Sequence, residues 1–217
     1  MNLLRVTVIV LLSGVADGVE INSPSTFDAD SEGWEPWSAV TPGGQTNSGG
    51  LAPGDGNYVI AADGVGQYGK MITYHVGGVW AGDYQSAGVT GIVMHIENRS
   101  TTDDVHLRVT LSNRTSPMEV GGTWWLAKTA IVVSNGQDWS LAQLPIDAAS
   151  FQKVGNFNGL LGPDTFAQVM GDVRSIRILS AAVLLGPFGD TFDGDVALDN
   201  ITLLGVSRPT GSVLQIR

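Results

Sequence analysis

The sequence predicts an all-β protein: a jelly-roll-like antiparallel β-sandwich, built as a single domain with one or two short helices. Glycine is frequent, at 29 of 217 residues, and charged residues make up only 15%, which is typical of short strands joined by tight turns. Hydrophobic residues reach 43%, enough to form a core. Short apolar runs follow one another with glycine-rich connections, and no strand–helix–strand alternation indicates a parallel sheet.

The N-terminus predicts the compartment. Residues 1–5 carry a basic side chain and the α-amine, residues 6–12 are uniformly apolar, and residues 14–16 supply the small side chains that a signal peptidase requires. We therefore expect residues 1–16 to be a signal peptide, with a first buried β-strand as the alternative. The remaining expected segments are an extended lead-in (17–25), the β-sandwich domain (26–205) and a C-terminal tail (206–217).

These features predict a secreted protein, periplasmic or extracellular, without membrane insertion after signal cleavage. No stretch after the signal peptide has the roughly 18 apolar residues that a membrane span needs. The net charge of −10 disfavours nucleic acid as a partner, because binding to phosphates needs a basic surface. The chain has no cysteine, which excludes disulfides, zinc–thiolate sites and cysteine nucleophiles.

The strands follow one another along the chain. An acidic turn followed by a Trp-bearing strand is predicted for residues 27–40, and a long Gly/Pro/Ser/Asn loop for residues 41–56. Further strands are predicted at 57–62, 68–76, 88–97, 104–112, 123–133, 138–146, 173–180 and 195–204. One turn of helix could form at 147–151, and a short helix at 163–170.

Two neighbouring strands show a strict two-residue alternation of apolar and polar side chains, which is typical of half-buried strands. The polar turn at residues 98–103 between them predicts an antiparallel hairpin. Such a hairpin would bring His95 and His106 together on one polar face, with Arg108 nearby. That face is either a solvated strand face or a ligand-facing surface. The alternating apolar residues are Ile92, Met94, Ile96, Leu107, Val109 and Leu111.

Six tryptophans supply aromatic surface beyond a minimal core. Trp124 and Trp125 are adjacent, so on a strand they point to opposite faces. Trp80 lies with Tyr84 in a loop-like segment. Exposed rings beside polar groups can stack on a sugar, and the alternative is aromatic side chains that cover the edges of the core. The candidate ligand contacts are Trp80, Tyr84, His95, His106, Arg108 and Trp124.

Two acidic clusters are candidates for a metal site. One contains Asp28 and Asp30, and the other ends at Asp199. Neither follows the EF-hand pattern, but hard cations such as Ca²⁺ favour clustered carboxylates in any frame. Pairing of the first and last strands would bring the two clusters together. The alternative is two solvated acidic turns.

Several segments resemble exported bacterial jelly-roll proteins of the PEP-CTERM-associated type, which are related to carbohydrate-binding-module β-sandwiches. The resemblance is carried by FDADSEGW (27–34), WAGDYQSAGVTGIVMHIEN (80–98), DVHLRVTL (104–111) and VALDNITL (196–203). It implies a structural calcium that joins the first and last strands, at Asp28 or Asp30 and Asp199. Residues 206–217 depart from the pattern, because they contain no Pro-Glu-Pro sorting motif.

Together these features predict a non-catalytic extracellular binding module for a polysaccharide or other glycan. Neither a GxSxG nucleophile elbow nor metalloprotease spacing of the histidines is present in the sequence. The first alternative is a structural or matrix protein that acts through self-assembly, since strand-rich chains can pair at their edges. The second is a glycoside hydrolase or lyase on a jelly-roll frame, which would need two carboxylates across a cleft.

Overall fold

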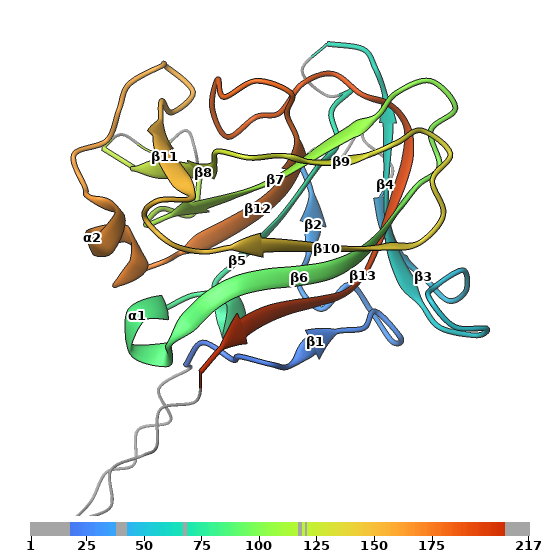
Figure 1. The fold of residues 1–217 in the computed structure, drawn as a ribbon, viewed down its shortest axis with the longest axis horizontal. Coiled ribbons are helices and arrows are strands. Elements are labelled where there is room, and N and C mark those ends of the chain that lie inside the picture. The colour runs from blue at the N-terminus through green and yellow to red at the C-terminus, as the bar shows by residue number, and fades with distance from the viewer. Residues whose placement is uncertain (1–17, 38–42, 67–68, 117–118, 120, 207–217) are drawn as a thin grey trace, which may run out of the picture.

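The computed structural model describes residues 18–37, 43–66, 69–116, 119 and 121–206, in which two antiparallel β-sheets face each other (Figure 1). The predicted all-β sandwich with short helices is confirmed. The predicted signal peptide and residues 207–217 of the predicted tail lie outside the described residues. No helix in the described part of the chain is long and apolar enough to cross a membrane.

The first sheet contains β1 (Pro24–Ser25), β3 (Gly43–Thr46), β4 (Asn57–Asp63), β6 (Val89–Asn98), β10 (Ser140–Pro145) and β13 (Asp193–Gly205). Its order is β10–β6–β13–β4–β3, with β1 also paired to β13. The second sheet contains β2 (Glu35–Pro36), β5 (Ile72–Val76), β7 (Val105–Ser112), β8 (Trp124–Ala127), β9 (Ile131–Val133), β11 (Phe151–Val154) and β12 (Ser175–Ser180). Its order is β11–β8–β7–β12–β5–β2, with β9 also paired to β7.

Short helices connect some of these strands. A 3₁₀ turn (Gly78–Trp80) and α1 (Tyr84–Ala87) lie between β5 and β6, and α2 (Phe166–Met170) precedes β12. The side chain of Thr165 accepts a hydrogen bond from the amide of Gln168, and a reciprocal bond completes a capping box at the start of α2. The short helix predicted at residues 163–170 is therefore confirmed.

The predicted hairpin between β6 and β7 is wrong. β6 pairs with β10 and β13, whereas β7 pairs with β8, β9 and β12 in the other sheet. The connection at residues 98–103 crosses between the sheets, and the Asn98 amide fixes it by donating to the carbonyl oxygens of Asp103 (2.9 Å) and Val133 (3.0 Å). The alternation is confirmed for β6, whose apolar residues such as Ile92 are buried while the residues between them are half-buried. In β7 the prediction of a half-buried strand is wrong, because the polar residues Arg108 and Thr110 are buried as well as Leu107. Alternation shows which face of a strand is buried, and facing strands of opposite sheets satisfy it equally.

The protein has two apolar clusters. The larger one fills the space between the sheets and includes Ile176 and Ile178 of β12. The smaller one lies on the outer face of the second sheet, where the alternate β12 residue Leu179 packs in the same cluster as Trp124. The segment 181–190 supplies Ala181 to this second cluster, so a connecting segment covers part of the outer face.

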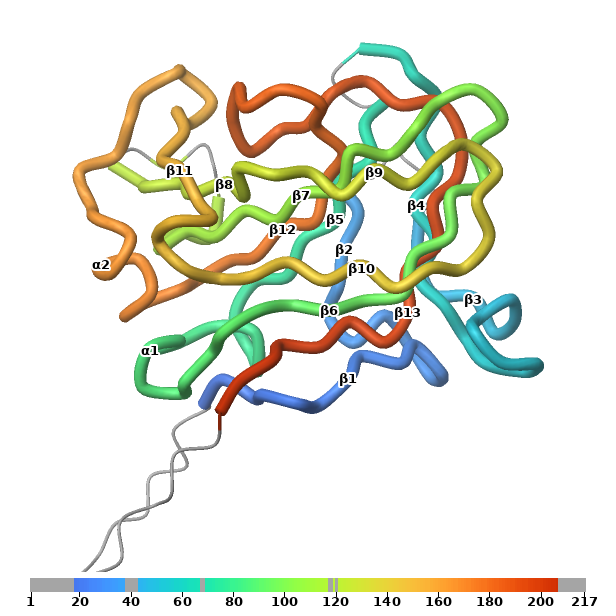
Figure 2. The backbone as a smooth tube through the Cα atoms, viewed as in Figure 1, coloured from blue at the N-terminus to red at the C-terminus, as the bar shows by residue number. Residues whose placement is uncertain are grey.

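The two ends of the described chain lie side by side. The Asn22 side chain exchanges two hydrogen bonds with the Gly205 backbone, at 3.2 and 3.3 Å. β1 pairs with β13 through Ser25 and Ile201, as expected for first and last strands. Figure 2 shows the two ends of the described chain together at the lower left of the sandwich, whereas the connections around residues 155–162 and 181–190 lie along its upper edge.

Candidate functional site

The three aromatic residues that were candidates for ligand contact are buried. Trp80, Tyr84 and Trp124 are only 3%, 1% and 0% exposed. Trp80 packs edge-to-face on Trp34, with 5.0 Å between the ring centroids, and its carbonyl oxygen accepts a hydrogen bond from the Tyr84 hydroxyl (2.8 Å). The segment is not an open loop, because the 3₁₀ turn and α1 turn these rings into the core. Of the two alternatives, exposed rings at these positions are wrong, and aromatic side chains that pack on the core are confirmed.

The polar candidates do not share a surface. His95 lies on β6 opposite Asp199 of β13, in the first sheet. His106 and Arg108 lie on β7 in the second sheet, so the two histidines belong to different layers. Both histidines are half-buried.

Arg108 is engaged with the backbone. It donates four hydrogen bonds, all to carbonyl oxygens: to Ala181 (2.6 Å), Ala127 (2.7 Å), Lys128 and Ala182 (3.3 Å). The side chain is buried, and burial lowers the pKa of its guanidinium, an effect that Asp190 opposes. Arg108 therefore ties β7 and the end of β8 to the segment that follows β12.

The predicted metal ligands bind backbone amides. Asp199 is buried, and its two carboxylate oxygens accept from the amides of Asn200 (2.7 Å) and Leu51 (3.1 Å). Burial raises the pKa of this carboxyl group, and these two hydrogen bonds lower it. Asp28 accepts from the amide of Gly56 at 3.3 Å, so it binds the same 47–56 loop as Asp199.

Asp30 is exposed and accepts a hydrogen bond from the amide of Glu32 (2.7 Å) in its own turn. Among the described residues, no group of three or more His, Cys, Asp or Glu side chains is arranged to hold a metal ion. The carboxylates at Asp28, Asp30 and Asp199 have backbone partners, and calcium at this place stays a prediction.

The structure instead places a groove on the outer face of the second sheet. One hollow of 230 Å³ is lined by Trp37, Lys70, Phe157 and Phe188. A second, of 470 Å³, is lined by Lys70 and Phe188 and by residues of the 181–191 segment that include Asp190. Because Lys70 and Phe188 line both hollows, we treat them as one site and call it the aromatic groove.

The rings of the aromatic groove are in contact. The centroid of Phe188 lies 5.6 Å from Trp37 and 5.5 Å from Phe157, and both pairs are edge-to-face. Phe157 is 51% exposed, whereas Trp37 and Phe188 are half-buried. Exposed aliphatic side chains of Val183 and Leu185 continue the apolar surface beside them.

Arg177 lies among the rings of the groove. Its guanidinium carbon is 4.7 Å from the Trp37 ring, 4.8 Å from Trp124 and 5.9 Å from Phe188, so the cation is stacked among aromatic faces. It donates one hydrogen bond, to the Pro187 carbonyl (3.1 Å). Burial lowers the pKa of Arg177 to about 9, and the Tyr74 hydroxyl opposes this shift.

Three cations hold the 181–190 segment on the sheet. Arg108 donates to the start of this segment, Arg177 to Pro187, and Lys70 to the carbonyl of Gly189 (2.7 Å). The Asp190 carboxylate accepts from the amide of Ala182 (2.6 Å) and closes the segment on itself. Backbone carbonyls that cover an apolar surface need donors, and these side chains supply them.

Lys70 and Asp190 are the charged groups that line the groove. Burial lowers the pKa of the Lys70 ammonium, and the nearby Asp190 carboxylate opposes this shift. Aromatic faces beside a few hydrogen-bonding groups can receive the apolar face of a sugar ring while its hydroxyls are bonded. Sequence reasoning missed this site because its rings come from residues 37, 157 and 188, which no local pattern connects.

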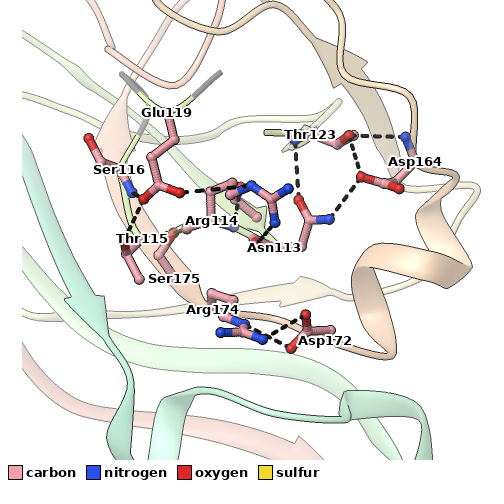
Figure 3. Close-up of polar contacts among 11 residues, drawn as sticks. Asn113, Arg114, Thr115, Ser116, Glu119, Thr123, Asp164, Asp172, Arg174 and Ser175 are labelled. Atoms are coloured by element: carbon pink, nitrogen blue, oxygen red, sulfur yellow. Dashed lines mark hydrogen bonds and ion pairs between the residues drawn. The ribbon is translucent and has the colours of Figure 1, made fainter. Parts of the chain in front are cut away.

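A separate polar cluster lies where β7, β8 and α2 approach one another (Figure 3). The Asp164 carboxylate accepts from the Asn113 amide (2.8 Å) and the Thr123 hydroxyl (2.9 Å), and the Asn113 bond is the main cause that lowers its pKa. A glycosidase general acid requires the opposite shift. Burial raises the pKa of Asp199, but that carboxyl lies in the first sheet and not in the groove.

No protein-family model matches the chain, and no curated protein matches it. Solved structures show where the fold recurs. The family 11 carbohydrate-binding module of a Clostridium thermocellum cellulosomal cellulase superposes with a TM-score of 0.53 at 16% identity, covering 89% of this chain and 99% of that one. A xylan-binding domain from Paenibacillus barcinonensis superposes at 0.52 with 11% identity, covering 88% and 97%.

A Clostridium thermocellum xylanase that contains a family 22 module, complexed with xylohexaose, superposes at a TM-score of 0.52 with 13% identity. The match covers 90% of this chain and 30% of that one. The structural neighbours are therefore carbohydrate-binding-module β-sandwiches, and the jelly-roll part of the predicted fold is confirmed. At these identities the likeness shows the fold alone.

Proposed function

We propose that the protein is a non-catalytic, extracellular glycan-binding module whose ligand lies in the aromatic groove. The observation that carries the proposal is the contact series Trp37–Phe188–Phe157 with the ammonium of Lys70 at its side. The rings offer stacking surfaces, and Lys70 and Asp190 offer hydrogen-bonding groups for sugar hydroxyls. Glycan-binding neighbours with the same fold support the same class of ligand.

The test is binding to a panel of soluble polysaccharides, by affinity electrophoresis and then by titration calorimetry. Phe157→Ala removes the most exposed ring of the groove, and stacking of one aromatic pair is worth about 0.5–1.5 kcal/mol. We therefore expect binding to weaken by about two- to tenfold. The melting temperature should hardly change, because the ring is 51% exposed.

Leu141→Ala is the matched control. Leu141 lies on β10 in the first sheet and is 62% exposed, so its truncation removes a similar apolar surface away from the groove. Its binding should equal that of the unaltered protein. Equal loss in both variants, or no binding to any polysaccharide, would refute the proposal.

Self-assembly as a structural protein is the second candidate. The exposed apolar side chains of Leu160, Leu161 and Leu185 favour it, because large apolar side chains on a surface can be covered by a second copy of the chain. Sedimentation at several concentrations separates the two functions. A monomer at every concentration that binds glycan supports the first, and concentration-dependent assembly without glycan binding supports the second.

A further inference from the structure

We infer that the aromatic groove selects a glycan that carries a carboxylate, a uronate-containing polysaccharide, and that Lys70 binds this carboxylate. The inference rests on the proposed glycan-binding function and adds the class of sugar to it. It follows from where the positive charges of an acidic protein are placed.

The ammonium group of Lys70 has more hydrogen-bond donors than it uses among the described residues. Its ammonium carries three N–H donors, and one of them is used by the Gly189 carbonyl at 2.7 Å. Within the described part of the chain, Lys70 forms no ion pair with a carboxylate, since the ion pairs there join Arg99 to Glu97, Arg114 to Glu119 and Arg174 to Asp172. With respect to the described residues, two donors of Lys70 therefore remain for a ligand, at the point where both hollows meet.

The groove is locally positive in a negative protein. Only 11 residues of the whole chain are Lys or Arg, against 21 that are Asp or Glu. Lys70 and Arg177 both lie at the aromatic groove, and Asp190 is the carboxylate that lines it. Arg177 is stacked on rings and has no ion pair among the described residues, and its Nε has no hydrogen-bond partner. Its charge is therefore not neutralised by the protein.

A uronosyl residue fits these features together. Its ring can stack on Phe157 or Phe188, and its carboxylate can accept the two remaining Lys70 donors, which makes charge-assisted hydrogen bonds. The positive field of Arg177 adds to the attraction at short range. A neutral sugar would use the rings equally well but would offer the ammonium no charged group besides the nearby Asp190 carboxylate.

The experiment compares polygalacturonate with fully methyl-esterified polygalacturonan, which share a backbone and differ in charge. We expect the unaltered protein to bind the acid form about tenfold more tightly, the value of one charge-assisted hydrogen bond at a partly exposed site. Salt at about 0.5 M should reduce the ratio, because it screens exposed charges. In Lys70→Gln the ratio should fall most of the way toward one, since glutamine can still donate to Gly189 but carries no charge, and the field of Arg177 accounts for the remaining preference.

Lys128→Gln is the matched control, because Lys128 also donates a hydrogen bond to a backbone carbonyl, that of Ala149 at 2.6 Å, and lies outside the groove. It should keep the preference for the acid form. Equal binding of both polymers by the unaltered protein, or an unchanged ratio in Lys70→Gln, overturns the inference and leaves the proposed function standing. Absence of binding to both polymers and to every neutral glycan overturns the function and the inference together.

Discussion

Replacing Arg108 with methionine tests whether this side chain supports the structure or contacts a ligand. Methionine keeps most of the buried volume and removes the four hydrogen bonds to backbone carbonyls. Ala127 and Ala181 are only 3% and 2% exposed, so their carbonyls have no easy replacement in water. Two buried acceptors that lose a charged donor cost about 1–3 kcal/mol each, and we expect a loss of about 3–5 kcal/mol in the free energy of unfolding.

The loss should lower the melting temperature by about 6–20 °C, since each kcal/mol moves a domain of this size by about 2–4 °C. The measurement is urea unfolding followed by tryptophan fluorescence. Arg174→Met is the control, because Arg174 forms an exposed ion pair with Asp172, and such pairs are worth about 0–1 kcal/mol. If Arg108→Met unfolds within about 1 kcal/mol of the unaltered protein but no longer binds glycan, our structural assignment is wrong and the sequence prediction of a ligand contact is right.

Two further measurements test buried titratable groups. Burial lowers the pKa of His75 below 6.5, so the unfolded chain takes up a proton at a higher pH than the folded chain. Stability should be constant between about pH 7 and 8 and should fall as the pH drops from about 6.5 through the folded-state pKa, and His75→Gln should remove this part of the slope. For calcium, we expect chelation to lower the melting temperature by several degrees, since a ligand at hundredfold excess adds about 2.7 kcal/mol, and Asp199→Ala to remove this response. Equal melting temperatures in calcium and in chelator would refute the calcium site and would mean that the Asp199 carboxylate serves only to accept its two hydrogen bonds from backbone amides.

The strands were predictable where apolar and polar residues alternate along the sequence. The predicted strand at 88–97 corresponds to β6 (Val89–Asn98), and the one at 104–112 to β7 (Val105–Ser112). Strands without apolar alternation escaped prediction. β3 (Gly43–Thr46) lies in the glycine-rich segment assigned to a loop, and it forms because it pairs with β4 along its whole length. This pairing joins residues of different segments, so a short stretch of sequence cannot predict it.

The candidate site was less predictable than the fold. Trp80 lies in a glycine-rich segment, and composition alone favours exposure there. Its burial depends on Trp34, which comes from far along the chain and packs on it. The same limit applies to the aromatic groove, whose rings come from Trp37, Phe157 and Phe188 and are far apart in the sequence. The composition indicated more aromatic side chains than a minimal core needs, but it did not indicate which of them would face the solvent.

One signal in the sequence could have located the groove. The segment AAVLLGPF (181–188) is apolar throughout, although it follows a strand and contains the Gly-Pro pair of a turn. An apolar connection is expected to pack on another apolar surface, and the strands already fill the main core between the sheets. It therefore predicts a second apolar cluster on an outer sheet face, which is where Leu179 and Trp124 lie.

The same signal changes how Arg108 and Arg177 are interpreted. Both occupy strand positions whose neighbours face the main core, and alternation alone assigns them to solvent. Beneath an apolar connection, however, the carbonyl groups of that connection lose water and need donors. A long cation on the strand below is the side chain that reaches them while its stem stays in the apolar layer. Arg108 and Arg177 both donate hydrogen bonds to carbonyl oxygens of residues 181–188. These two arginines therefore fix the apolar segment on the sheet, and the segment in turn forms one wall of the groove.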